Sequence, residues 1–93
     1  MLFGVHDGVI NGNTVGYVEL AGATSAVGIY GWGVQRVSCA DNVLNGGAGP
    51  DSAGISFIDA AAGGAGGLAV TLASEGNMVS SNTIRNFARQ TTR

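Results

Sequence analysis

Carboxylates are the residues of this sequence that could carry out hydrolytic chemistry, and there are six of them. Hydrolysis of a glycosidic bond needs two carboxyl groups that face each other across that bond. Asp41 and Asp59 would meet this need if neighbouring layers of a stacked fold, about 4.8 Å apart, brought them together. The alternative is that both are solvated turn carboxylates. We assign no catalytic residue, and Asp41 and Asp59 are the candidates to test.

The other groups that catalyse reactions lack the partners they need. His6 stands beside Asp7, but a nucleophilic triad also needs an oriented Ser or Cys, and there is no Gly-x-Ser-x-Gly turn. Cys39 is the only cysteine, which excludes an internal disulfide and a multi-cysteine metal site, and we interpret it as a small buried hydrophobe. The Gly-rich run at 63–67 lacks the Lys-Ser or Lys-Thr of a phosphate-binding loop. We therefore predict no metal site and no cofactor.

Aromatic side chains are the candidates for binding another molecule. Tyr30 and Trp32 alternate with Gly31 and Gly33, so both rings fall on one face of an expected strand. Such rings stack on sugars or anchor protein interfaces, and we favour packing against a neighbouring chain. Arg36 is the only basic residue in the middle of the chain, and it joins them in the predicted binding set. The further candidates for stacking on a sugar are Tyr17, Phe57 and Phe87.

Composition narrows the class of protein. The 93 residues make at most one domain, which we delimit as 1–93, either a complete module or a piece of a longer chain. Hydrophobic residues make up 45%, too many for a disordered chain. Only 11% are charged, Lys is absent and the net charge is −2, which argues against nucleic acid as a partner. We see no signal peptide and no apolar run long enough to span a membrane.

Two short elements alternate along the chain. The first has an apolar residue, two small or polar residues, Asn, any residue and a branched apolar residue. Asn13 and Asn42 in this element lie 29 residues apart, and Asn42 and Asn82 lie 40 apart. The second element is Gly28-Ile29 and Gly54-Ile55, which lie 26 residues apart and between the Asn residues. A repeat of this length is typical of a solenoid.

The alternation of Asn-x-[Val/Leu/Ile] with Gly-Ile resembles the right-handed parallel β-helix family, which includes pectate-lyase-like enzymes and phage tailspikes. In such a fold, residues at the same point of successive turns stack on one another. The branched residues Val15, Leu44 and Ile84 would then stack inward, and Asn13, Asn42 and Asn82 would form a column joined by their amides. The alternative is that these Asn residues occupy ordinary loop turns without stacking.

We therefore predict an all-β fold, a short right-handed parallel β-helix of about three turns. Alternating residues also predict strands around 30–34, 68–73 and 82–87. The third turn is longer and contains the Ala/Gly run 60–67, which suits either an extruded loop or an irregular strand against a partner. The tail from Thr83 fits either a short helix or a strand that frays.

The predicted function is structural. Both ends of so short a stack would expose strand edges and apolar residues, which association with other chains would cover. The expected protein is an extracellular or virion-associated module of a fibre or tailspike-like spike. It would form a homo-oligomer, with a trimer favoured, or join the rest of a longer chain, and it could contact polysaccharide. The alternative is a fragment of a polysaccharide lyase, hydrolase or epimerase. The resemblance implies Asp clusters and a basic residue for a lyase, and the sequence has neither an Asp-x-x-Asp cluster nor Lys.

Overall fold

The computed structural model describes residues 1–16, 26–46, 49–64 and 67–92. Within these ranges every helix or strand element is a β-strand, so the all-β prediction is confirmed. In chain order the strands are β1 (Leu2–Phe3), β2 (Val9–Asn11), β3 (Thr14–Gly16), β4 (Val27–Trp32), β5 (Ser38–Ala40), β6 (Val43–Asn45), β7 (Ala53–Ile58), β8 (Met78–Ser80), β9 (Thr83–Arg85) and β10 (Arg89–Thr92).

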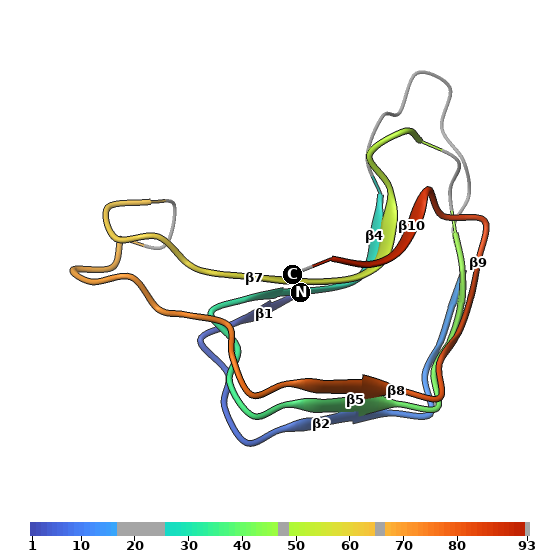
Figure 1. Ribbon diagram of the computed structural model, residues 1–93, viewed down its shortest axis with the longest axis horizontal. Helices are drawn as coiled ribbons and strands as arrows, with labels where there is room; N and C mark the ends of the chain where they lie inside the picture. The colour runs from blue at the N-terminus through green and yellow to red at the C-terminus, as the bar shows by residue number, and fades with distance from the viewer. Residues whose placement is uncertain (17–25, 47–48, 65–66, 93) are drawn as a thin grey trace.

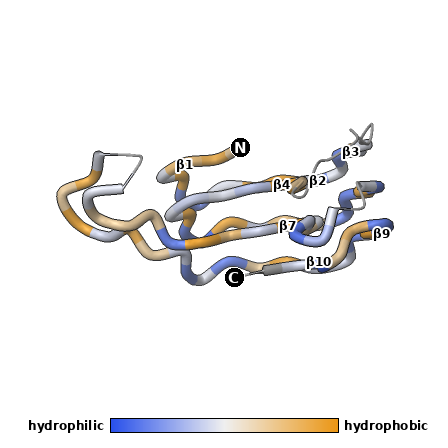
Figure 2. The backbone as a smooth tube through the Cα atoms, turned by 90° about the horizontal axis from the view of Figure 1, so that it is seen from above, coloured by the Kyte–Doolittle hydropathy of each residue, from blue (hydrophilic) through white to orange (hydrophobic). Residues whose placement is uncertain are grey.

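These strands form three parallel sheets. The strand order is β1-β4-β7-β10 in the first sheet, β2-β5-β8 in the second and β3-β6-β9 in the third. Neighbours in every sheet therefore come from successive passes of the chain, and each pass, or coil, adds one strand to each sheet. This is a short parallel β-helix of about three coils, as predicted (Figure 1). Figure 2 shows the coils stacked, with the N-terminus at one end of the stack and the C-terminus at the other.

Equivalent apolar residues stack inside the coil, which explains the register. In the third sheet Val15 pairs with Leu44, and Leu44 with Ile84. In the first sheet Ile29 pairs with Ile55. Leu44 is 0% exposed, and complete burial of such a side chain contributes about 1.5–3 kcal/mol. A register slip of one residue would turn this column outward, so the apolar pattern fixes the pairing. The buried apolar core comprises Val34, Val37, Cys39, Leu44, Ile55 and Phe57.

The two corners that flank the second sheet use left-handed backbone in every coil. After that sheet, φ is 70° at Gly12, 56° at Asp41 and 56° at Ser81. Before it, the equivalent residues are Asp7, Arg36 and Gly76, with φ of 55°, 52° and 68°. For residues other than Gly this conformation costs about 1–2 kcal/mol each. The shared corner geometry turns the chain at the same point of each coil and so keeps successive strands in line.

The third coil departs from the regular stack. After β7 the chain runs outward, and it returns where Ala60 and Leu72 form an antiparallel bridge through two backbone hydrogen bonds of 2.9 and 2.8 Å (Figure 1). The strand predicted at 68–73 is wrong, because this segment lies outside the sheets and Val70 is 73% exposed. The tail forms β9 and β10 rather than a helix.

Candidate functional site

A column of Asn side chains lies at the corner between the second and third sheets. Asn42 donates its backbone N–H and its Nδ2 to Oδ1 of Asn82, at 3.0 and 2.9 Å. Oδ1 of Asn42 in turn accepts the backbone N–H and the Nδ2 of Asn13, at 2.9 and 3.0 Å. The structure thus brings the three predicted ladder residues together, and each amide oxygen below receives two donors from the coil above.

The middle residue of this column is completely buried. Asn42 is 0% exposed, and its Nδ2 also donates to the carbonyl oxygen of Ile10 at 3.1 Å. Nδ2 of Asn82 donates to the carbonyl oxygen of Cys39 at 3.0 Å. A buried amide without partners would destabilise the fold, whereas here both ends of the Asn42 side chain are bonded. The column therefore joins the coils, and its chemistry is architectural.

Two further polar side chains join coils, and sequence reasoning missed both. Oγ of Ser74 accepts the backbone N–H of Val34 at 3.0 Å and donates to the carbonyl oxygen of Ile58 at 2.6 Å. Oδ1 of Asn77 accepts the backbone N–H of Val37 at 2.9 Å, and its Nδ2 donates to the carbonyl oxygen of Val34 at 2.9 Å. The only signal was the cluster of turn-forming residues at 74–77.

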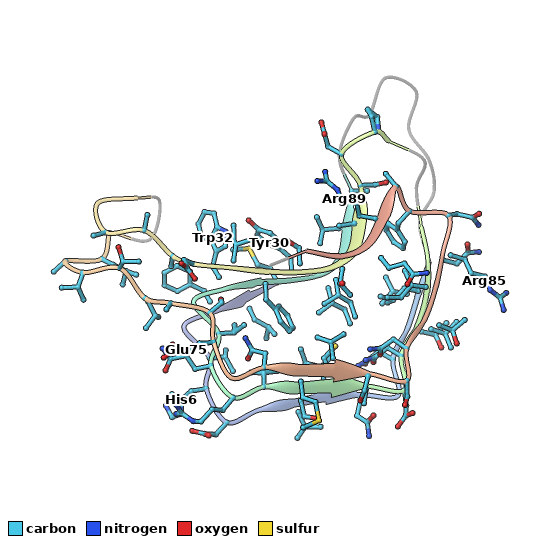
Figure 3. The ribbon with its side chains drawn as sticks, viewed as in Figure 1. His6, Tyr30, Trp32, Glu75, Arg85 and Arg89 are labelled. Carbon is cyan, nitrogen blue, oxygen red and sulfur yellow. The ribbon has the colours of Figure 1, made fainter. Side chains whose placement is uncertain are left out.

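The predicted aromatic pair lies on the outer face of the first sheet. Tyr30 and Trp32 alternate with inward-facing positions of β4, and both point away from the coil interior (Figure 3). The ring of Trp32 has its centroid 6.0 Å from that of Tyr30 and 6.2 Å from that of Phe3 in the coil above. Nε1 of Trp32 is buried, and it has no hydrogen-bond partner in the part of the chain that the structure describes.

The remaining sugar-stacking candidates do not join this aromatic face. Phe57 is 3% exposed and belongs to the core, because its position in β7 faces inward. Phe87 is half-buried and packs against the same core. Tyr17 lies outside the described residues.

The third predicted binding residue, Arg36, is engaged by a carboxylate of the preceding coil. Its Nε and Nη2 donate to Oδ1 and Oδ2 of Asp7 at 2.7 and 2.9 Å, a two-pronged contact. Nδ1 of His6 lies 2.8 Å from Oδ2 of Asp7. The hydrogen bonds from Arg36, and then that from His6, hold the pKa of the Asp7 carboxyl well below its usual range, and the same carboxylate raises the pKa of Arg36. All three side chains are exposed, so this pair links two coils at the surface.

The two candidate catalytic carboxylates occupy different corners of the coil. Asp41 follows β5, at the left-handed corner between the second and third sheets. Asp59 follows β7, at the far end of the first sheet, and its Oδ1 accepts the backbone N–H of Ser74 at 2.8 Å. The stacking that would bring two acids together acts only on residues at the same point of successive coils. The structure therefore does not pair Asp41 with Asp59.

Comparison with protein-family models, with curated proteins and with solved structures finds no match. Among residues 1–16, 26–46, 49–64 and 67–92 there is no group of three or more His, Cys, Asp or Glu that could hold a metal ion. In the same part of the chain, no helix has the length and hydropathy to cross a membrane. The chain is thus characterised by its parallel β-solenoid architecture, its Asn column and its outer aromatic face.

Proposed function

We propose that this chain is a structural β-helical module of an extracellular or virion-associated fibre or spike, and that it works by associating with other chains. The observation that carries the proposal is the outer aromatic face, which we define as Phe3, Tyr30, Trp32 and Ile58. Phe3, Trp32 and Ile58 occupy one row across three coils because they pair in register. A large apolar row on the outside of a sheet is what an interface between chains needs.

The charge distribution supports the same proposal. Large apolar side chains are exposed on more than one sheet: Phe3 is 41% exposed on the first, Met78 63% on the second and Val43 44% on the third. Only 11% of the residues are charged, so few charges interrupt these faces. Lateral association of three copies through the outer aromatic face would bury the row, which we propose as the trimer contact. The resemblance to tailspike-like β-helices is consistent with a spike.

Solution mass by light scattering behind a sizing column tests the proposal. We expect a trimer for the natural sequence and a smaller species for Trp32→Ala, because Trp32 lies at the centre of the row. Val70→Ala is the matched control, since it removes an equally apolar side chain that is 73% exposed on the projecting segment. A folded monomer for the natural sequence would refute the proposal. Loss of polysaccharide binding in Trp32→Ala with an unchanged mass would assign the face to glycan recognition instead.

The alternative of a polysaccharide-active enzyme has less support. Glycoside hydrolysis requires two carboxyl groups on either side of a bond, and Asp41 and Asp59 belong to different corners. Arg36, the one basic residue at mid-chain, directs its guanidinium to Asp7. We therefore retain the structural role as the proposed function.

A further inference from the structure

The Asn column ends in complementary groups at the two ends of the stack. Within it, each Asn donates its backbone N–H to Oδ1 of the Asn below. Each Asn carbonyl oxygen also accepts the N–H of the residue after the next Asn, at 2.8 Å from both Val43 and Thr83. At the upper end, Oδ1 of Asn13 and the N–H of Thr14 have no such neighbour among the described residues. At the lower end, the same holds for the N–H and the carbonyl oxygen of Asn82.

These end groups match each other in kind and in direction. The lower end offers the N–H of Asn82, and the upper end offers Oδ1 of Asn13 as its acceptor. The upper end offers the N–H of Thr14, and the lower end offers the carbonyl oxygen of Asn82. A second copy placed below the first in the same orientation would therefore continue both series of hydrogen bonds, and an inverted copy would not.

The apolar interior continues in the same way. The upper end holds an open hollow of about 280 Å³, lined on its apolar side by Leu2, Ile10, Val15 and Ile29. Val79 and Ile84 occupy the same two columns at the lower end, as the pairings of Ile10 through Cys39 to Val79 and of Val15 through Leu44 to Ile84 show. Stacking would set Val79 of one copy over Ile10 of the next, and Ile84 over Val15.

The first sheet has matching ends as well. β10 pairs with Ala53–Ser56 of β7, and β1 takes the register of Phe57 and Ile58, because Leu2 pairs with Gly31 and Phe3 with Trp32. In a head-to-tail stack, β10 of one copy and β1 of the next would therefore occupy consecutive stretches of one strand position. Met1, which is 80% exposed, would turn aside at this junction. Strands β8 and β9 would pair with β2 and β3 of the next copy.

We propose that copies of this chain stack head to tail, the lower end of one on the upper end of the next, to form one continuous β-helix. This inference rests on the proposed structural function, and it adds the axis along which the fibre grows. The contact uses the strand edges at the ends of the stack, whereas the lateral trimer contact uses the outer aromatic face, so the two contacts can be tested separately.

Disulfide trapping tests the stacking register. Asn11, Ala40 and Ser80 form one exposed column of the second sheet, so Ser80 of one copy would lie about 4.8 Å above Asn11 of the next. This distance suits a disulfide, whereas within one copy the two positions are separated by a whole coil. We expect the double variant Asn11→Cys with Ser80→Cys to give, after mild oxidation, a ladder of multiples on non-reducing gels. The natural Cys39 is buried and serves as the unreactive background.

The matched control pairs Asn11→Cys with Arg85→Cys, which lies in the third sheet and would not meet Asn11 in the stack. No ladder from the first pair, or an equal ladder from both, would overturn the proposal. Thr14→Pro provides a second test, because proline removes the N–H that the upper end offers, and Thr14→Val keeps it. We expect the ladder to be lost in Thr14→Pro and kept in Thr14→Val. A ladder that persists when Trp32→Ala has abolished the trimer would uphold end stacking while refuting the aromatic contact as its cause.

Discussion

Replacement of Asn42 by Ala tests whether the Asn column holds the coils together. The side chain makes four hydrogen bonds: two that it donates, to Asn82 and to the Ile10 carbonyl oxygen, and two that it accepts from Asn13. Alanine removes all four. It also leaves two backbone groups without their partners, the carbonyl oxygen of Ile10 and the N–H of Asn13.

The expected loss follows from these two groups. A backbone group left without a hydrogen bond in a site shielded from water costs about 1–3 kcal/mol, and two such groups give about 3–5 kcal/mol once the smaller side-chain cavity is included. A folded chain of this length has a total stability of about 5–14 kcal/mol. Asn42→Ala is therefore expected to remove a large part of the free energy of unfolding.

Two variants calibrate the result. Asn13→Ala loses one amide contact at the exposed end of the column, and Oδ1 of Asn42 still accepts the N–H of residue 13, so we expect a loss of about 1 kcal/mol. Asn45→Ala removes an exposed amide that contacts Asn86 on the outer surface at 2.6 Å, and we expect a loss of at most about 0.5 kcal/mol.

Urea unfolding followed by the fluorescence of Trp32, the only tryptophan, provides the measurement. All variants are compared at one protein concentration, because the stability of an oligomer depends on concentration. The reasoning is refuted if Asn42→Ala loses no more stability than Asn13→Ala, since the buried and exposed positions of the column would then be equivalent.

Two further predictions concern close packing and pH. Gly54→Ala would place a methyl group 2.5 Å from Cγ2 of Ile84, and we expect urea unfolding to show a loss of about 1–3 kcal/mol. Gly16→Ala, where a methyl group meets nothing within 4 Å, is expected to be neutral or slightly stabilising, and equal effects at the two sites would contradict the packing argument. The pKa of Asp7, followed by carboxyl NMR, is expected to lie well below its ordinary value of 3.8 and to rise towards it in Arg36→Leu. Because folding lowers this pKa, the ion pair stabilises the fold above about pH 3.8 and the contribution is lost as pH falls towards the folded value, so an unchanged Asp7 titration in Arg36→Leu would refute the assignment.

The parts of the fold that could be predicted are those that repeat. Asn13, Asn42 and Asn82 stand at one point of a repeated element, and a parallel solenoid stacks equivalent points. The Gly-Ile element works in the same way, since Ile29 and Ile55 pair in register. These signals survive coils of different length, because the extra residues leave the stack at the corners.

The parts that could not be predicted depend on contacts that occur once. Asp7 and Arg36 are different residue types at equivalent corners 29 residues apart, so no repeated letter marks their ion pair. Ser74 and Asn77 bond to the coil before them, but the long segment after β7 hides which residues are their equivalents. The alternation at 68–73 predicted a strand, and it failed because the segment has no neighbouring strand to pair with. Alternation shows that a strand could form, whereas pairing decides whether it does.

The Asn column also bears on the order in which the chain acquires its structure. Its rungs join residues 29 and 40 positions apart, so no rung can form before a complete coil of chain has closed on itself. Loop-closure entropy opposes such contacts, and folding slows as the sequence separation of partners grows. The first closure, between two adjacent coils, is therefore expected to limit the rate, and the remaining coil then adds to an existing template as in a one-dimensional array. During synthesis the N-terminal coil leaves the ribosome first, so each later coil meets a finished edge on which to fold.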